Sequence, residues 1–544
     1  MNGDPRIRLL GAPGSGDWSE VAEAVLARLD ETEIVVAASA DADPAARVAV
    51  AAFVAMTARL VPHVKISSAG DLPVNWWQAR SWDDLLERLK QVRPISTGAP
   101  RRQIKVGFGV AQDGYDLYVG GGDWNVLLGV GPVDLEDRNV HALGVHAAAC
   151  LAVSQVLIKL LGEFGFPGVA LTDQSGTSGR IETNLVDHGL HTVGIKTPER
   201  FLPVPGRPLR AGFLGVGSVG TSALALLATV CSPVLNRTLQ ASPALEITAV
   251  DKDAFDPDRN PYRYPALIGG ESDHKAQAIV DRLKELGMVA EPVVADVGTW
   301  NSTKADAGWQ GVLISSVDTI PGRLDVADVL GERTLSAGVS GTELHVQWER
   351  FADGFACPFC DYVRADPPLT QAGVFAAVTG IPVSRVLALL QDGAALTASD
   401  VEMAIAAGRV PAQRREALTG APLSDLVRQA YAEAELRPQG AAAGPSTDVV
   451  AVAAPQVSWF AGALIAAELV KDMLGLPTVI RRVDLDVAGL PAGVVRSVPA
   501  DGTGTCVCHS GVRRRWYRAM YGAAEPELTA APRDPVSFLP ITTG

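Results

Sequence analysis

The N-terminal part of the chain alternates between short apolar runs and longer stretches with apolar residues at helical spacing. The strand-like runs are Ile7–Leu10, Glu33–Ala37, Val64–Ser67, Lys105–Gly109 and Leu117–Val119. The helical stretches are Glu20–Leu29, Ala45–Leu60, Asp83–Gln91 and His141–Leu161. Because strands and helices that take turns along a chain are typical of layered α/β folds, residues 1–200 are predicted to form an α/β domain.

A second α/β pattern begins after a proline-rich stretch at residues 197–210. An apolar run ends at Leu214, a G-x-G-x-x-G turn follows, and Thr221–Thr229 has a helical pattern. The glycines of this turn are Gly215, Gly217 and Gly220. A strand, a glycine turn and a helix start in this order direct main-chain N–H groups at an anion. The turn predicts a nucleotide phosphate site, although its spacing alone is a weak signal.

Charged and polar residues follow the next strand-like runs, Leu245–Val250 and Gly311–Ser315. They are Asp251, Asp253, Asn260, Arg263, Lys275 and Asp318. An acid at the tip of the second strand normally holds ribose hydroxyls, Arg and Lys neutralise phosphates, and an Asp at a strand's carboxyl end can hold Mg²⁺. A nicotinamide enzyme needs no such group of Asn, Arg and Lys, so these residues favour ATP over NAD.

This ordered set of residues resembles the ThiF/MoeB/HesA family, whose members adenylate ubiquitin-like proteins and sulfur carriers. The similarity extends from about Arg210 to Cys360 and resumes near Gln456–Cys508. It implies a Rossmann-like adenylation domain with a mixed or parallel sheet, formed by residues 205–369 and 448–510.

The resemblance also implies roles for individual residues. The turn glycines, Asp251 and Asp253 would belong to the nucleotide site, with Asp251 on the ribose. Asn260, Arg263 and Lys275 would bind phosphates and Asp318 would coordinate Mg²⁺, and we expect Arg263, Lys275 and Asp318 to act in catalysis. The implied reaction is attack of a partner's C-terminal carboxylate on the α-phosphorus of ATP, which gives an acyl-adenylate and pyrophosphate.

Four of the six cysteines form two closely spaced pairs, Cys357-x-x-Cys360 and Cys506-x-Cys508. Each pair can bring two thiolates to one tetrahedral Zn²⁺. In the family, a pair after the adenylation core meets a second pair near the C terminus, so the resemblance implies a structural zinc clip. The C-x-C spacing departs from the family's C-x-x-C, and His509 beside it is an alternative ligand. Two unrelated pairs are the other interpretation.

Adenylation itself needs no protein nucleophile, so a catalytic cysteine would matter only for a later thioester. The two cysteines left over, Cys150 and Cys231, both fit small apolar side chains. Of these, Cys231 lies nearer a predicted loop and is the better thioester candidate.

Residues 370–447 carry helical patterns and contain no cysteine, so this predicted helical insertion is not a thioester domain. The patterns lie at Phe375–Ala377, Val383–Leu390, Ala398–Ala407 and Leu423–Ala434. A break rich in Ala, Gly and Pro at residues 438–446 ends the insertion, and residues 511–544 are assigned to a tail.

Leu151–Lys159 resembles Ala463–Lys471, and both stretches lead to a Leu-Gly pair. This echo favours an N-terminal region that is an inactive copy of the adenylation domain, as some family members have. An unrelated α/β adaptor is the alternative. Such a copy would take the place of a second subunit or allow further homodimerisation.

Composition limits the partners and the compartment. A net charge of −14 argues against nucleic acid as the main partner. The uncharged stretch Ala211–Asn236 is long enough for a membrane span, but its turn glycines and Pro233 fit a buried strand, turn and helix better. The start of the sequence lacks a signal-peptide pattern, so we expect a cytoplasmic protein without a membrane partner.

Three alternatives to activation of a carrier protein stay open at this point. A peptide-modifying adenylyltransferase would use the same fold. An NAD(P)-dependent oxidoreductase is supported only by the glycine turn with Asp251. A non-catalytic pseudoenzyme would follow if the inserted loop predicted at Ser232–Leu245 blocked ATP.

Overall fold

The computed structural model describes most of the chain in separate stretches. These are residues 6, 18–95, 98–136, 139–164, 166, 168, 170–171, 179–186, 209–236, 245–256, 260–268, 273–304, 307–351, 354, 356–357, 359–360, 375–376, 378–435, 454–476, 482–488, 494–496, 500–501, 504 and 506–522. Outside these residues lie positions 197–208 of the proline-rich stretch predicted at 197–210, the break predicted at 438–446, the strand predicted at Ile7–Leu10 and most of the inserted loop predicted at Ser232–Leu245.

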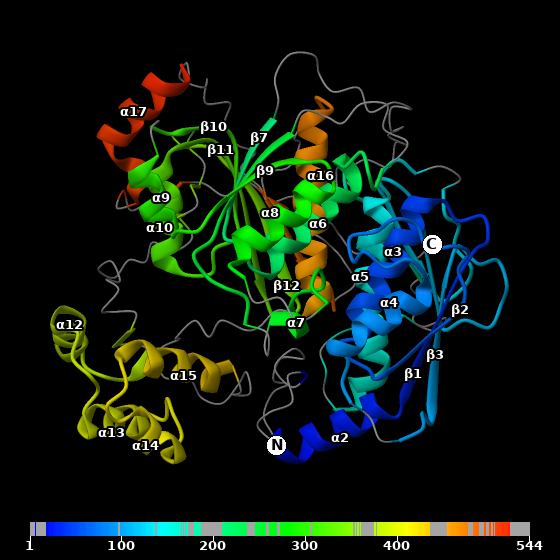
Figure 1. Cartoon of the computed structure of the whole chain (residues 1–544), viewed down its shortest axis with the longest axis horizontal. Helices are drawn as coiled ribbons and strands as arrows, with labels where there is room; N and C mark the ends of the chain where they lie inside the picture. Colours follow the sequence, from blue (N-terminus) through cyan, green and yellow to red (C-terminus); the bar gives the residue numbers. More distant parts are fainter. Residues whose placement is uncertain are drawn as a thin grey trace. The chain divides into compact units, whose positions relative to one another are not determined.

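The chain divides into two compact units (Figure 1). The larger unit consists of residues 24–361 and 453–544 and contains two β-sheets. The smaller unit consists of residues 1–23 and 362–452. The two parallel-rich sheets confirm the α/β class predicted for the chain and are consistent with Rossmann-like domains.

The first sheet has six strands in the order β2-β1-β3-β4-β5-β6. Its strands are β1 (Thr32–Ala38), β2 (His63–Ser68), β3 (Arg102–Phe108), β4 (Leu117–Gly121), β5 (Asn125–Gly129) and β6 (Arg180–Asn184). The α-helices of this part are α2 (Trp18–Asp30), α3 (Pro44–Thr57), α4 (Trp82–Arg88) and α5 (Leu143–Leu161). Strands β2, β1, β3 and β4 are parallel, whereas β5 and β6 extend the sheet antiparallel.

The second sheet has eight strands in the order β14-β13-β12-β11-β10-β7-β8-β9. Its strands are β7 (Leu209–Leu214), β8 (Leu245–Val250), β9 (Val289–Val293), β10 (Trp309–Ser315), β11 (Gly331–Ser340), β12 (Glu343–Glu349), β13 (Arg482–Asp486) and β14 (Val494–Arg496). Its helices are α6 (Ser218–Cys231), α7 (Asn260–Arg263), α8 (Lys275–Glu285), α9 (Val297–Thr303), α10 (Ile320–Val329), α16 (Pro455–Met473) and α17 (Gly511–Tyr521). Strands β9, β8, β7, β10 and β11 are parallel, and β12, β13 and β14 are antiparallel.

The connectivity of the first sheet recurs in the second. In each, the first strand (β1 or β7) has the next strand (β2 or β8) on one side and a later one (β3 or β10) on the other. A parallel strand (β4 or β11) and two antiparallel strands (β5 and β6, or β12 and β13) complete the shared order. The second sheet adds β9 and β14 at its edges.

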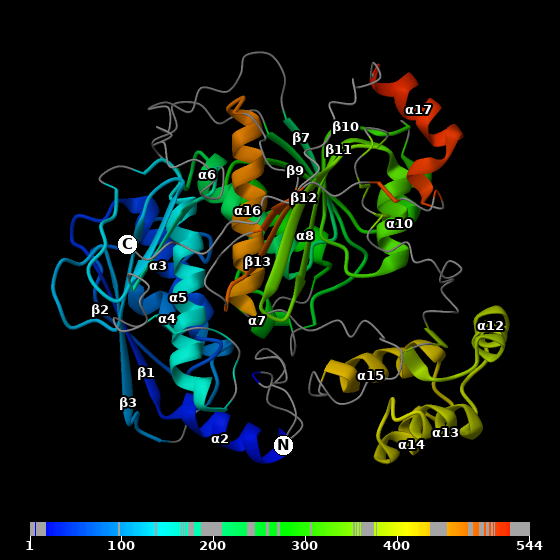
Figure 2. The ribbon, with the colours of Figure 1, turned by 180° about the vertical axis from the view of Figure 1, so that it is seen from behind.

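Helices α5 and α16 occupy equivalent places in the two halves. α5 joins β5 to β6, α16 precedes β13, and each helix has 19 residues. They pack side by side between the two sheets (Figures 1 and 2), where the Trp459 indole donates to Nδ1 of His146 at 3.3 Å. The two similar stretches, Leu151–Lys159 and Ala463–Lys471, therefore lie in two helices that pack against each other.

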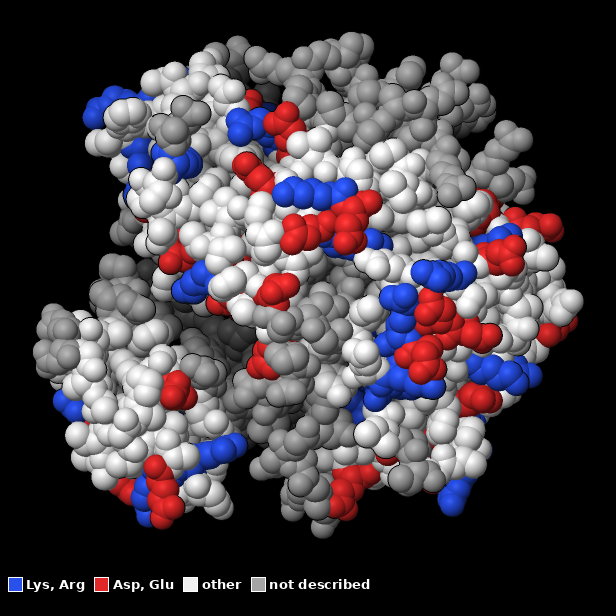
Figure 3. Space-filling model, in the orientation of Figure 1, with Lys and Arg blue, Asp and Glu red and all other residues white. Residues whose placement is uncertain are grey.

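The stretch Ala211–Asn236 contains β7, the glycine turn and α6, as the sequence predicts, and α6 is only 14 residues long. Of the described helices, one stretch, Leu143–Phe164, is long and apolar enough to cross a membrane. Within the structure, 94% of its most apolar window is buried. On the face drawn in Figure 3, acidic and basic side chains are interspersed and form no extended basic patch.

The smaller unit is helical in its described part and has its own apolar core. Its α-helices are α12 (Val383–Asp392), α13 (Ala398–Ala406), α14 (Arg415–Leu418) and α15 (Leu423–Glu435). Val386, Val401 and Leu426 are each fully buried in this core. The helical patterns predicted over residues 383–434 coincide with these helices.

Residues 511–522, which the sequence analysis assigns to the tail, form a packed helix instead of a solvated run. The Tyr517 hydroxyl donates to the carbonyl of Glu332 at 2.7 Å, and Tyr521 accepts a hydrogen bond from Trp309 N. α17 is thereby held at the end of the second sheet. Residues 523–544 lie outside the described part of the chain.

Candidate nucleotide site and candidate metal centre

The glycine turn after β7 leaves the start of α6 open. Gly215 has φ +88°, which favours glycine, and a Cβ on Gly220 would lie 2.4 Å from the Gly215 carbonyl oxygen. Gly217 is the N-cap of α6 and provides no side-chain cap. A Cβ on Gly217 would meet only the Tyr264 hydroxyl, at 3.9 Å. The described residues therefore place no side-chain cap on the first N–H groups of α6, the kind of helix start that binds phosphate groups in proteins.

Asp251 follows β8, and its carboxylate binds the main chain of this turn. Its Oδ2 accepts a hydrogen bond from Val216 N at 2.7 Å, and its Oδ1 accepts one from Asp253 N at 2.9 Å. Burial raises the pKa of the Asp251 carboxyl group, while Lys275 and these two N–H groups oppose the shift. Its carboxylate thus fixes the turn in addition to the ribose role predicted for it.

Lys275 begins α8 and reaches back to Asp253. Its Nζ lies 3.2 Å from Asp253 Oδ2, and its side chain is only 11% exposed. Burial alone would lower the pKa of Lys275, but Tyr264, Asp251 and Asp253 together outweigh burial and raise it. A buried ammonium group that stays charged beside the turn is suited to bind an anion.

Asn260 and Arg263 lie at the two ends of the short helix α7. Asn260 Oδ1 accepts a hydrogen bond from Asp256 N at 2.7 Å, so it also closes its own turn. The Arg263 carbonyl accepts a 2.7 Å hydrogen bond from the Ser218 hydroxyl. The Nε of Arg263 is buried and has no hydrogen-bond partner among the described residues. An anionic ligand would supply one.

Tyr264 is the residue that sequence analysis missed. Its side chain is buried, and burial raises the pKa of its hydroxyl. The charges of Lys275 and Arg263 lower that pKa, while those of Asp251 and Asp318 raise it, so all four predicted residues are close enough to act on this one phenol. Its position directly after Arg263 is the only signal for it in the sequence.

Asp318 stands across the turn from these residues, between β10 and α10, and is exposed. The neighbouring Ser316 hydroxyl donates to the Gly215 carbonyl at 2.7 Å, which joins the two loops. β7 and β10 are adjacent parallel strands at the point where the strand order reverses, the usual location of ligands in open α/β sheets. The structure thus brings the predicted nucleotide residues to one edge of the sheet, and their ligand roles stay predictions.

The equivalent turn in the first sheet is closed. Asp43 caps α3, with Oδ1 accepting from Ala46 N at 2.8 Å and Oδ2 accepting from Asn139 N at 2.7 Å. Pro44 takes the first helical position and removes another N–H group. A carboxylate of the chain itself therefore stands where α6 leaves room for a phosphate.

The two cysteines outside the pairs are buried. Cys231 is the last residue of α6, and burial raises the pKa of its thiol to about 12. Burial also raises the pKa of the Cys150 thiol well above its ordinary value. Cys231 precedes the turn at 233–235, near a loop as the sequence predicts, but both thiols are buried, which makes them poor candidates for a thioester.

Three arginines lie in or just after the proline-rich stretch before the glycine turn, Arg200, Arg207 and Arg210, and none is assigned to the ATP site. Arg210 lies at the start of β7 and is held by other residues. Its Nε lies 3.6 Å from Glu246 Oε2, and its guanidinium group stacks on Trp309 at 4.7 Å. Arg200 and Arg207 lie outside the described residues.

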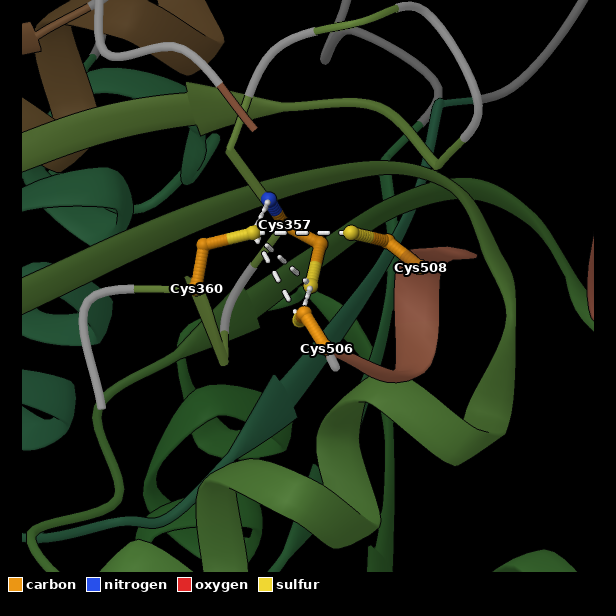
Figure 4. Close-up of side chains that lie close together, drawn as sticks. All are labelled: Cys357, Cys360, Cys506 and Cys508. Carbon is orange, nitrogen blue, oxygen red and sulfur yellow. Dashed lines mark hydrogen bonds between the residues drawn. The ribbon is translucent and has the colours of Figure 1, made fainter. Parts of the chain in front are cut away.

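The four paired cysteines come together in one cluster (Figure 4). Cys360 Sγ lies 3.8 Å from Cys357 Sγ and 3.5 Å from the sulfurs of Cys506 and Cys508. Four thiolates around Zn²⁺ at 2.3 Å have sulfurs about 3.8 Å apart, so the cluster fits a tetrahedral zinc ion. His509 is not part of this group of ligand atoms.

Main-chain groups support this candidate zinc site. Cys357 N donates to Cys360 Sγ at 3.3 Å, and Asp501 N donates to the same sulfur at 3.4 Å. Such N–H···S contacts orient thiolate ligands and stabilise their charge. Arg514 of α17 donates to the Cys508 carbonyl at 2.8 Å, so the cluster joins the C-terminal helix to the loop after β12.

No protein-family model and no curated protein matches the sequence. Among solved structures, the chain is similar to E. coli MccB with MccA-N7isoASN, at 13% identity over 56% of this chain and 67% of that chain, with a TM-score of 0.31. The microcin C7 biosynthetic enzyme MccB in complex with N-formylated MccA gives 14% identity over 56% and 67%, with a TM-score of 0.32. E. coli MccB with ATP gives 12% identity over 55% and 67%, with a TM-score of 0.30. Because these TM-scores are below 0.5, we base the function on the residues of this chain.

Proposed function

We propose that this chain is an ATP-dependent adenylyltransferase that activates the C-terminal carboxylate of a polypeptide. The observation that carries the proposal is the group of charges around Tyr264, at the open start of α6. Arg263 and Lys275 supply positive charge there, and Asp251 and Asp318 supply carboxylates. A dinucleotide with two phosphates has less need of such an arrangement than a triphosphate.

Each residue has a defined task in this reaction. The N–H groups of the glycine turn and of α6 bind phosphate oxygens, and Asp251 holds the ribose. Arg263 and Lys275 reduce the repulsion between the triphosphate and the incoming carboxylate. A carboxylate oxygen forms a bond to the α-phosphorus, the bond from that phosphorus to its bridging oxygen breaks, and pyrophosphate leaves.

Asp318 is the residue we assign to Mg²⁺. Its exposed carboxylate follows the carboxyl end of β10, the strand that pairs with β7. The bound ion would neutralise charge on the phosphates. Asp318→Asn should therefore abolish Mg²⁺-dependent adenylation, and an active variant would remove this assignment.

The cysteines limit the chemistry available after adenylation. Four of the six are in the cluster that fits zinc, and the other two are buried. We therefore propose that the acyl-adenylate passes to an acceptor that is not a cysteine of this chain. A sulfur-carrier or ubiquitin-like protein is one substrate class, and a peptide whose adenylate is captured by an amide or amine is the second. The lack of an accessible cysteine favours the peptide as much as the carrier protein.

We also propose that the N-terminal half is an inactive copy of the adenylation half. The shared strand order and the equivalent helices α5 and α16 support common descent. Asp43 and Pro44 at the start of α3 account for the loss of phosphate binding in this copy.

The experiment that tests the function is calorimetric titration of the full chain with Mg·ATP, NAD and NADP. Micromolar binding of Mg·ATP without dinucleotide binding would support adenylation. Dinucleotide binding without ATP would replace it with redox chemistry. If none binds, the chain is a pseudoenzyme or completes its site only with a partner, which pyrophosphate exchange with candidate C-terminal peptides would distinguish.

A further inference from the structure

Arg59 of the N-terminal half is completely buried against the segment that carries Arg263. It lies two residues after α3 ends at Thr57, and its side chain has no exposed surface. Its Nε donates to the Pro261 carbonyl at 2.7 Å and its Nη2 to the Tyr264 carbonyl at 2.9 Å. The guanidinium group also donates to the carbonyls of Leu267 and Ala55. Arg59 therefore joins its own helix to α7 and the following turn.

Two tryptophans of the N-terminal half bind the same turn. Trp76 Nε1 donates to the Ala266 carbonyl at 2.9 Å, and Trp77 Nε1 donates to the Pro265 carbonyl at 3.0 Å. Together with Arg59, they satisfy every carbonyl from Tyr264 to Leu267. Trp76 and Trp77 are thus buried parts of an internal interface.

Residues 260–268, which comprise α7 and the following turn, are not expected to keep their conformation without tertiary contacts. α7 has only four residues, and a helix of that length is unstable without tertiary contacts. Its C-terminal carbonyls carry partial negative charge and need donors. The guanidinium group meets three carbonyls of the segment at once, one in α7 and two after it, which the single ammonium of a lysine cannot do with the same geometry.

The opposite side of the segment faces the nucleotide site. The Arg263 carbonyl accepts from Ser218, the first residue of α6, and the Tyr264 hydroxyl lies near Gly217. A continuous series of contacts therefore leads from Arg59 through α7 to the glycine turn.

We propose that Arg59 is a positioning residue for the nucleotide site. Triphosphate binding then depends on how the N-terminal half packs against α7. Arg59 holds α7 so that Arg263 faces the triphosphate. This inference rests on the proposed ATP site. The N-terminal half then has a function in binding although its own phosphate turn is closed.

The test compares Arg59→Met with the unaltered full chain. Methionine retains an unbranched aliphatic side chain but lacks the hydrogen-bond donors of the guanidinium group. Calorimetry should show a loss of about tenfold or more in Mg·ATP affinity, because several hydrogen bonds that fix α7 are lost, with adenosine affinity nearly unchanged. Hydrogen–deuterium exchange of residues 260–268 should rise selectively, and millimolar guanidinium should restore Mg·ATP affinity in Arg59→Ala.

Arg47→Met is the matched control. Arg47 lies on α3, the helix that precedes Arg59, and also donates to main-chain carbonyls, those of Ala40 and Asp71, but only within the N-terminal half. Its loss should leave Mg·ATP affinity and exchange at 260–268 unchanged. If Arg59→Met does not fold, Trp76→Phe removes one donor to the segment and should still weaken Mg·ATP binding severalfold.

The outcomes separate this inference from the proposed function. Unaltered Mg·ATP affinity in a folded Arg59→Met, or in Trp76→Phe if Arg59→Met is unfolded, would overturn the positioning role. An equal loss of adenosine and Mg·ATP affinity, with exchange raised throughout, would mean general destabilisation and would also overturn it. If the unaltered chain binds no Mg·ATP, the proposed function fails, while exchange at 260–268 still decides whether Arg59 holds the segment.

Discussion

The Ser218 hydroxyl donates a 2.7 Å hydrogen bond to the carbonyl of Arg263. This contact fastens α7 to the first turn of α6, so the residue that carries the predicted phosphate-binding guanidinium is fixed to the helix whose N terminus would hold the same phosphates. The side-chain Nε of Arg263 nevertheless has no hydrogen-bond partner among the described residues.

Arg263→Ala should weaken Mg·ATP binding strongly and leave adenosine binding nearly intact. The loss should be about 10- to 100-fold, since hydrogen bonds to a charged group contribute about 1.5–3 kcal/mol. Thermal stability should hardly change, because no described residue loses a side-chain hydrogen bond. Arg210→Ala, whose guanidinium group pairs with Glu246 away from the site, is the control. Equal loss of adenosine and ATP affinity would contradict a phosphate role.

Two glycines of the turn should respond differently to replacement by alanine. A Cβ on Gly220 would collide with the Gly215 carbonyl oxygen at 2.4 Å, so Gly220→Ala should lower the unfolding free energy by about 1–3 kcal/mol. A Cβ on Gly217 meets nothing closer than 3.9 Å, so Gly217→Ala should fold normally.

Gly217→Ala should instead reduce Mg·ATP affinity, because the methyl group would occupy the space in front of α6. Denaturant unfolding and calorimetry on both variants measure the two effects separately. A Gly217→Ala protein with unaltered Mg·ATP affinity would show that phosphate does not bind at this helix start.

The sequence predicts the parts of the site that depend on local order along the chain. The strand, glycine turn and helix at Leu214–Thr229 follow from consecutive residues, and Asp251 and Asp318 follow from their places after β8 and β10. Because parallel strands bring their carboxyl ends to one edge, these acids had to meet near the turn. The two cysteine pairs converge as the resemblance implies.

Long-range contacts explain what the sequence did not predict. Nothing near Arg59 in the sequence marks it as different from any other arginine at a helix end, since its acceptors around α7 are about 200 residues away. β5 and β6 are short, and their pairing depends on the sheet already formed by β1–β4. α17 carries several arginines and resembles a solvated run, but Tyr517 and Tyr521 attach it to the sheet.

Asp400 should make the helical insertion sensitive to acid. Hydrogen bonds from Arg385 lower the pKa of Asp400 to about 2 from a reference value of 3.8, and Thr397 adds to the effect. Because the folded-state pKa is the lower one, this carboxylate stabilises the unit above about pH 4, and the stabilisation is lost as pH falls toward 2. Asp400→Asn should therefore cost about 2 kcal/mol at neutral pH and progressively less below pH 4.

Hydrogen–deuterium exchange of α12–α15 in the full chain measures this cost. Glu416→Gln, at an exposed carboxylate of α14, is the matched control and should leave exchange unchanged. A cost that stays constant between pH 7 and pH 2 would show that charge on Asp400 does not matter.

The cysteine cluster predicts that the purified chain contains about one zinc ion, since its four sulfurs match a tetrahedral site. Cys506→Ser and Cys508→Ser should lose the metal, whereas His509→Ala should retain it, because His509 lies outside the group of ligand atoms. Metal analysis of protein purified without chelators measures this directly.

Removal of zinc should lower the melting temperature and raise hydrogen–deuterium exchange in α17, because Arg514 of that helix binds the Cys508 carbonyl. If the purified protein contains no zinc and chelation leaves its melting temperature unchanged, the four cysteines are buried thiols that do not form a structural zinc site.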